Sequence, residues 1–191
     1  MKKFLAVLIL IFTLQIPSWA DDIRDFQIEG MSIGDSALDY YSKEKIKKNI
    51  SIPGKKFNVS GFNLDSGTYD RITISYKTDD KKYEIHSISA HVIFGDNIKA
   101  CYKKQNEIAN ELSELFKNLT KEDWGVLEAG NPTDPEATYR PITYDFKKEK
   151  NAPRIQIACY DFFIASGYDR LKVLVYSGEY RKHISKVAKK R

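Results

Sequence analysis

Most of the motifs that identify an enzyme are missing from this sequence of 191 residues. It contains no Gly-x-Ser-x-Gly elbow, no phosphate-binding glycine loop, no His-Glu-x-x-His and no Asp-rich calcium loop. Only three histidines and two cysteines are present, and none of them stands at metal-ligand spacing from acidic residues. The sequence therefore predicts no cofactor and no metal ion, and it favours a protein that is not an enzyme.

Neither sign of charge is in large excess, since 31 Lys and Arg residues oppose 26 Asp and Glu residues. A nucleic-acid-binding protein typically carries a clustered basic face on a known module, and the sequence has neither, so we expect no nucleic-acid partner. Most of the basic excess lies in residues 181–191, which are amphipathic. This tail has two interpretations: a solvated outer helix face, or a weak contact with an anionic membrane surface.

The one long apolar run lies at the start of the chain, over residues 4–16. Two lysines precede it, and Ser18 and Ala20 follow in the small-x-small pattern of a cleavage site. The run is shorter than the roughly 20 residues of a transmembrane helix. We therefore expect a signal peptide over residues 1–20, cleavage after Ala20, a single domain over residues 21–191 and a periplasmic or secreted location. A retained membrane anchor is the alternative.

The two cysteines, Cys101 and Cys159, lie far beyond the expected cleavage site. An even number of cysteines in an exported protein indicates a disulfide, and two cysteines allow only one pairing. Cys101 lies on the apolar face of a predicted helix, and Cys159 lies on the apolar face of a predicted strand. The sequence therefore predicts a disulfide that joins this helix to a sheet, with two buried free thiols as the alternative.

Five segments have the alternating apolar pattern of strands: residues 70–77, 83–94, 142–146, 155–159 and 171–176. The apolar phase of the second segment changes near His86 and Ser87, which predicts a β-bulge. The last segment is apolar at most positions, which is typical of a central strand.

The strongest helix pattern runs from Ile98 to Leu119, about 22 residues, with Asp96 as the predicted cap. Its apolar stripe consists of Ile98, Cys101, Gln105, Ile108, Leu112, Leu115 and Leu119. Shorter helices are predicted near both ends of the mature chain. We therefore expect an α+β domain with a mainly antiparallel sheet of about five strands, one long helix packed on a face and short terminal helices.

The histidines and acidic residues are weak candidates for catalysis. His86 and His91 are five positions apart on one predicted strand and so point to opposite faces, and His183 lies in the basic tail. Acidic pairs such as Asp79-Asp80 and Glu122-Asp123 fall in predicted polar turns. A small hydrolase would need two carboxylates, or a histidine, assembled in space.

The tripeptide Tyr-Asp-Arg occurs twice, at residues 69–71 and 168–170, each time at the mouth of a predicted strand. One interpretation is that both strand entries line one rim of the sheet. The weak binding residues would then be Tyr69, Arg71, Tyr168 and Arg170. The other interpretation is coincidence, because some tripeptide recurs in a chain of this length.

Residues 26–36, Phe-Gln-Ile-Glu-Gly-Met-Ser-Ile-Gly-Asp-Ser, resemble the opening of uncharacterised small exported proteins of marine bacteria. The likeness extends to the surroundings of Cys101 and to the strand around Cys159. More distantly, a short strand, a Gly-rich turn and a capped helix are similar to the start of the BamE/SmpA envelope proteins, from which this chain differs by lacking a lipidation cysteine and by its greater length. The resemblance implies an exported envelope protein and transfers no functional residue.

The sequence thus favours an exported, non-enzymatic binding or interaction module whose partner is a small ligand or another envelope protein. The alternative function is a small secreted hydrolase that uses carboxylates or a histidine. A deep pocket holding His86 or His91 beside a buried carboxylate would favour the hydrolase. A sheet face or rim crowded with exposed Tyr and Phe side chains would favour binding.

Overall fold

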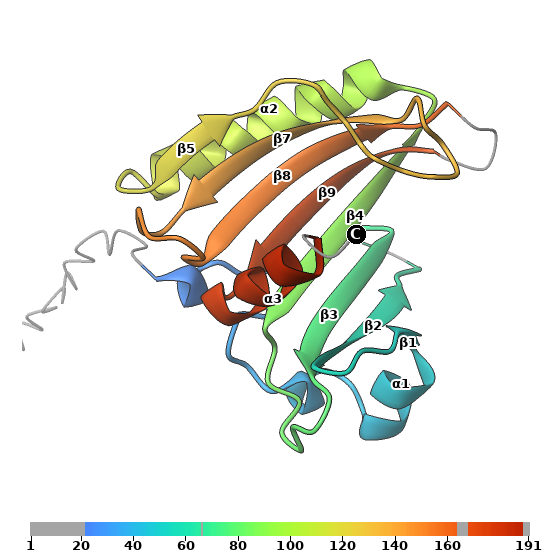
Figure 1. The fold of residues 1–191 in the computed structure, drawn as a ribbon, viewed down its shortest axis with the longest axis vertical. Coiled ribbons are helices and arrows are strands. Elements are labelled where there is room, and N and C mark those ends of the chain that lie inside the picture. Colours follow the sequence, from blue (N-terminus) through green and yellow to red (C-terminus); the bar gives the residue numbers. More distant parts are fainter. Residues whose placement is uncertain (1–21, 66, 164–167, 189–191) are drawn as a thin grey trace, which may run out of the picture.

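The computed structural model describes residues 22–65, 67–163 and 168–188, and the predicted signal peptide, residues 1–20, lies outside this part of the chain. The described residues form one continuous sheet of nine strands, in which all of the strand pairs are antiparallel. In the view of Figure 1, helix α2 lies behind this sheet and helix α3 lies in front of it. The protein is therefore an α+β protein that is rich in strands.

The strands are β1 (Ile50–Ile52), β2 (Phe57–Asn63), β3 (Arg71–Lys77), β4 (Ser87–Gly95), β5 (Thr120–Asp123), β6 (Leu127–Glu128), β7 (Thr138–Asp145), β8 (Arg154–Asp161) and β9 (Asp169–Tyr176). The α-helices are α1 (Lys43–Lys48), α2 (Ile98–Leu115) and α3 (Gly178–Ala188), and two 3₁₀ turns, η1 (Ile23–Asp25) and η2 (Ala37–Asp39), precede them. Among the described helices, none is long and apolar enough to span a membrane.

Two antiparallel meanders meet in the middle of the sheet, where β4 pairs with β9. The strand order is β1-β2-β3-β4-β9-β8-β7-β5, and β6 also pairs with β7. Helix α2 carries the chain from the end of β4 to the far edge at β5 (Figure 1). This connection places β9 at the centre, as its apolar sequence predicts, and brings β3, β4 and β9 side by side.

The hydrophobic core lies on one face of the sheet. Alternate residues of the three central strands are buried there: Ile72, Ile74, Ile88, Ala90, Leu171, Val173 and Val175. Helix α2 packs on β8, β9 and β4, and the N-terminal segment adds Ile28, Met31 and Ile46 to the same core. Because side chains alternate along a strand, the remaining residues of β3, β4 and β9 point to the opposite face.

The prediction of about five strands is wrong, because the sheet has nine strands in the described residues. The five predicted strands are present as β3, β4, β7, β8 and β9, and β1, β2, β5 and β6 are additional. Strand β5 has the polar sequence Thr-Lys-Glu-Asp, so Glu122 and Asp123 lie on a strand and not in a turn. Strands β1, β5 and β6, with three, four and two residues, form because a neighbour supplies hydrogen-bond partners, and not because of their own side-chain pattern.

The predicted bulge near His86 and Ser87 is also wrong. Strand β4 begins at Ser87, and Tyr83, earlier in the predicted strand, has a φ of +53°, far from the negative φ values of regular strands. The change of apolar phase therefore marks the start of the strand. The irregularity in β4 lies instead at Ile93–Gly95, opposite β9.

Helix α2 has 18 residues instead of about 22, and Asn97, not Asp96, caps it by accepting a hydrogen bond from the N–H of Ala100 at 3.0 Å. Its buried side chains are Cys101, Gln105, Ala109 and Leu112. Leu115, predicted to pack on the sheet, is 62% exposed, whereas Phe116 is 4% exposed. The helix ends at Leu115, so the chain turns there and Phe116 enters the core.

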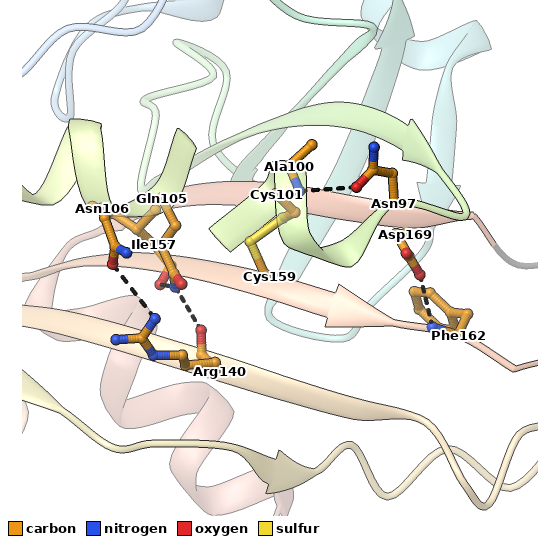
Figure 2. Close-up of a disulfide and its surroundings, with 10 residues drawn as sticks. All are labelled: Asn97, Ala100, Cys101, Gln105, Asn106, Arg140, Ile157, Cys159, Phe162 and Asp169. Carbon is orange, nitrogen blue, oxygen red and sulfur yellow. Dashed lines mark hydrogen bonds between the residues drawn. A yellow bond between two sulfur atoms is a disulfide. The ribbon is translucent and has the colours of Figure 1, made fainter. Parts of the chain in front are cut away.

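The predicted disulfide between Cys101 and Cys159 is confirmed, and it joins α2 to β8 (Figure 2). The two Cα atoms are 6.0 Å apart, within the usual range, and both residues are fully buried. One turn further along α2, Gln105 Nε2 donates hydrogen bonds to the carbonyl oxygens of Arg140 at 2.6 Å and Ile157 at 2.9 Å (Figure 2). The helix is therefore attached to the sheet by a covalent bond and by side-chain hydrogen bonds to the strand backbone.

Candidate functional site

The face of the sheet opposite the core is polar in its middle. The side chains that point there are Arg71, Thr73 and Ser75 from β3, Ser87, Ser89 and His91 from β4, and Arg170, Lys172 and Leu174 from β9. The hydroxyl oxygens of Ser75 and Ser87 are 3.3 Å apart, and both serines are buried. Because serine side chains are short, they leave a hollow between the larger side chains around them.

Helix α3 lies on this polar face (Figure 1) and is held there by ion pairs. Arg181 Nη1 contacts Asp145 Oδ1 at 2.6 Å. Glu179 contacts Lys56 at 2.8 Å and Lys77 at 2.9 Å, and hydrogen bonds from these two lysines lower the pKa of Glu179 to about 2. The first turn of α3 is therefore anchored, and the rest of the helix forms a wall beside the hollow.

A cavity of about 530 Å³ opens between α3 and strands β3, β4 and β9. Four basic side chains line its polar end, and we call them the basic cluster: Arg71, His91, Arg170 and Lys172. A second hollow of about 210 Å³ shares three members of this cluster and is also lined by Tyr160 and Phe162. The basic cluster therefore lies where two hollows adjoin.

Strand pairing explains why these four side chains lie together. Arg71 is paired with His91 across β3 and β4, and His91 is paired with Lys172 across β4 and β9. Arg170 lies two residues before Lys172 and so points to the same face. Directly opposite residues have Cβ atoms about 4.5–5.5 Å apart, so three strands from distant parts of the sequence concentrate basic groups in one place.

The cations of the basic cluster have no acidic partner in the part of the chain that the structure describes. Lys172 is partly buried, and burial, followed by repulsion from Arg170, lowers the pKa of its ammonium group. One carboxylate, that of Asp70, also lines the cavity; its Oδ2 accepts a hydrogen bond from the N–H of Ile93 at 2.7 Å, and among the described residues it forms no ion pair with the three cations, which outnumber it. The cavity therefore has an excess of positive charge.

Neutral neighbours orient the two arginines. Arg71 Nη1 donates to Asn63 Oδ1 at 2.8 Å, and the guanidinium group lies over Gly61, where an added Cβ would be 2.2 Å from Nη2. The guanidinium carbon of Arg170 lies 4.5 Å from the ring centre of Phe162, in a cation–π contact. Both charges are thus held in place without being neutralised.

An aromatic row borders the cluster on the side of β7 and β8. The rings of Tyr139 and Tyr160 are stacked with centres 5.4 Å apart, and those of Tyr160 and Phe162 are stacked at 6.2 Å. Burial is the main cause that raises the pKa of Tyr160 to about 12, so its hydroxyl group remains a neutral donor. This rim therefore offers ring faces and hydroxyl groups next to the cations.

His91 is uncharged at neutral pH. Its Nε2 lies 3.1 Å from Ser89 Oγ. Burial, followed by repulsion from Lys172, Arg170 and Arg71, lowers its pKa from 6.5 to about 4. Between these two pKa values the unfolded chain binds a proton at His91 and the folded chain does not, so the free energy of unfolding decreases as the pH falls through this window.

We therefore expect His91→Gln to reduce the acid sensitivity of the fold. On lowering the pH from 7 to about 4, wild type should lose on the order of 2 kcal/mol more stability than the variant, because about 1.4 kcal/mol accompanies each pKa unit. Urea unfolding at the two pH values measures this difference. Equal losses in both proteins would contradict the lowered pKa of His91.

The four binding residues predicted from the sequence are only partly brought together. Arg71 and Arg170 both line the cavity. Tyr69 is partly buried against the hydrophobic core, and Tyr168 is 56% exposed outside the cavity lining. The repeated tripeptide therefore places its arginines in one cavity and its tyrosines elsewhere.

The sequence did not single out Lys172, and it offered His91 as a weak catalytic candidate and not as part of a binding site. The sequence feature that could have indicated Lys172 is the alternation in β9, where Arg170 and Lys172 alternate with Leu171 and Val173. Positive charges at alternate positions of a central, otherwise apolar strand indicate a face that is not packed in the core.

The other two histidines lie apart from the cluster. His86 Nδ1 is 3.2 Å from Ser177 Oγ, and the rings of both His86 and His183 pack against Phe57. Burial lowers the pKa of both imidazole groups. Among the described residues, no group of three or more His, Cys, Asp and Glu side chains is arranged to hold a metal ion.

These features define an α+β protein with a single sheet, a disulfide-linked core on one face and a basic cleft on the other. No protein-family model, curated protein or solved structure matches the chain. The resemblance to small exported proteins and to the BamE/SmpA proteins therefore stays a prediction from the sequence.

Proposed function

We propose that this protein is a non-enzymatic module that binds an oxyanion, a carboxylate or phosphate group, in the cleft between β3, β4, β9 and α3. The observation that carries the proposal is the basic cluster, in which Arg71, Arg170 and Lys172 line one cavity without an acidic partner among the described residues. The partner would be a small ligand, since the cluster lies in a cavity and not on a projecting surface.

An unpaired cation is costly to bury. Burial removes water from the ammonium group of Lys172, and this cost is offset when an opposite charge lies nearby. The guanidinium groups of Arg71 and Arg170 present paired N–H donors that match the oxygens of a carboxylate or phosphate. An oxyanion in the cavity would therefore satisfy charges that the protein itself leaves unpaired.

The hydrolase alternative is supported by one observation, the 3.1 Å distance between Ser89 Oγ and His91 Nε2. A general base works best when its pKa is near the operating pH, whereas the pKa of His91 is about 4 and its neighbours are cations. Ser89 is also only 2% exposed, which restricts access of a substrate to its hydroxyl group. We therefore favour binding, and ester hydrolysis that is lost in Ser89→Ala would reverse this preference.

We expect the protein to bind inorganic phosphate or acetate, and Lys172→Met to weaken this binding about ten- to a hundredfold. This loss of affinity corresponds to about 1.5–3 kcal/mol, the usual contribution of a hydrogen bond to a charged group. Methionine keeps most of the side-chain length and removes the charge. Titration followed by calorimetry, or by chemical shifts of the residues around the cavity, measures the affinity.

Lys103→Met is the matched control. Lys103 is exposed on α2, on the opposite side of the sheet, and its loss changes the net charge by the same amount. Its affinity for phosphate should stay within about twofold of wild type, since exposed charges are strongly screened. Equal weakening by both substitutions, or no weakening by Lys172→Met, would refute the proposed site.

We also propose that the protein works in the periplasm or outside the cell. The proposal is supported by the signal-peptide pattern of residues 1–20, and a disulfide is compatible with an oxidising compartment. In that setting the ligand would be an anionic molecule of the bacterial envelope or of the medium.

A further inference from the structure

An apolar groove continues from the basic cleft. It has a volume of about 760 Å³ and lies between α3 and strands β1 and β2. Its apolar lining consists of Ile52, Phe57, Val59, Ile184 and Val187, with Lys55 and His183 as polar neighbours. Four of its residues, Ile52, Val59, Tyr180 and Ile184, also line the cavity that holds the basic cluster. The two spaces therefore adjoin, with the cations in the first and apolar side chains in the second.

The apolar groove is incompletely covered by the protein. Ile52 is 61% exposed and Val187 is 42% exposed, although both belong to the lining of the groove. Helix α3 is anchored at its first turn by Arg181 and Glu179, and no residue of α3 whose side chain is described is fully buried. Exposed apolar side chains gathered in a groove mark a binding surface more often than they mark a solvated one.

The dimensions suit an extended chain. Arg170, in the basic cluster, and Leu174, next to the apolar residues, are four residues apart on β9, which is about 13 Å at the rise of a strand. A ligand that reaches from the cations past Leu174 to Ile184 and Val187 is therefore longer than an isolated oxyanion. It needs an anionic group at one end only.

We propose that the ligand is a single-chain anionic amphiphile, with its oxyanion head at Arg71, Arg170 and Lys172 and its alkyl chain along α3 in the groove. This inference rests on the proposed oxyanion site and adds the apolar part of the ligand. The positive charge of the cluster favours an anionic head group. The residues that line both cavities indicate that the alkyl chain of the ligand would extend from the cluster toward the groove. We infer a free amphiphile and not a membrane surface, because the cations lie on the sheet inside the cavity and do not project from an edge.

Calorimetry with hexyl, octyl and decyl phosphate, each kept below its micelle concentration, tests this inference on the full chain. We expect affinity to rise roughly two- to fourfold per methylene, the upper value being that of a fully buried methylene. Val187→Thr should reduce this dependence on chain length and leave the affinity for inorganic phosphate unchanged, because Val187 lines the groove and does not line the cavity of the basic cluster. Lys172→Met should weaken all of the alkyl phosphates by a similar factor.

Val126→Thr is the control for Val187→Thr, because it is the same chemical change at a residue that is 57% exposed and does not line the groove. Phosphate binding without any dependence on chain length would overturn the amphiphile and leave the oxyanion site intact. An absence of binding by both phosphate and alkyl phosphates would overturn the oxyanion site as well. Binding to vesicles of anionic phospholipid without binding of monomeric amphiphiles would show that the cleft faces a membrane, and would also overturn the inference.

Discussion

We expect the double variant Cys101→Ala, Cys159→Ala to be about 4 kcal/mol less stable than the disulfide-bonded protein. The bond closes a loop across 58 residues of sequence, and the entropy that such a loop removes from the unfolded chain corresponds to this value. Both residues are fully buried between α2 and β8, so alanine avoids placing hydroxyl groups in the core. For a domain that is stable by about 5–15 kcal/mol, the loss is a large share of the total.

Urea unfolding of the variant and of the oxidised wild type measures this effect. Reduced wild-type protein is a useful third sample, since it loses the bond and keeps both sulfur atoms. We expect the reduced protein and the double variant to unfold at similar urea concentrations. A double variant within about 1 kcal/mol of the oxidised protein would mean that the disulfide contributes little beyond the packing around it.

The second large effect concerns Leu112. We expect Leu112→Ala to lower the free energy of unfolding by about 2–5 kcal/mol, because removal of a buried leucine side chain leaves a cavity. Leu112 is 3% exposed and lies on the face of α2 that contacts the sheet, in line with Cys101 and Gln105. Urea unfolding again provides the measurement.

Leu115→Ala is the matched control, on the same helix and with the same chemical change. Leu115 is 62% exposed, so its truncation should change stability by no more than about 0.5 kcal/mol. The sequence pattern alone predicts similar losses for both leucines. Comparable destabilisation by the two substitutions would therefore contradict the observed end of α2 and support the longer helix.

The fold could be predicted where a segment carries its own periodic pattern. Strands β3 and β9 alternate clearly, and α2 has apolar residues at helical spacing, so both kinds of element are visible in the sequence. Strand β1 has only three residues, and strand β5 consists of four polar residues. Neither strand carries such a pattern, so neither could be predicted. They become strands only when a neighbouring strand offers backbone hydrogen-bond partners.

The candidate site could be predicted only in part. The repeated Tyr-Asp-Arg tripeptide points to Arg71 and Arg170, which line the same cavity. Lys172 and His91 join them through strand pairing, and Gly61 leaves room for the guanidinium group of Arg71. No local pattern in a single sequence predicts that β4 pairs with β9, whose partners are 74 or more positions apart, and the cluster depends on that pairing.

The sequence by itself determined the pairing of the two cysteines, the position of α2, the five strands β3, β4, β7, β8 and β9, and the polar phase of β9. Each of these follows from residue identity or from short-range periodicity, which acts within a few neighbouring positions. Only the tertiary structure decided the strand order, the formation of β1, β2, β5 and β6, and the placement of α3 over the polar face. These depend on contacts between distant segments, since hydrogen bonds and side-chain packing between strands form only after the chain has brought them together. The basic cleft and its apolar groove belong to this second group, because their residues come from β1, β2, β3, β4, β9 and α3.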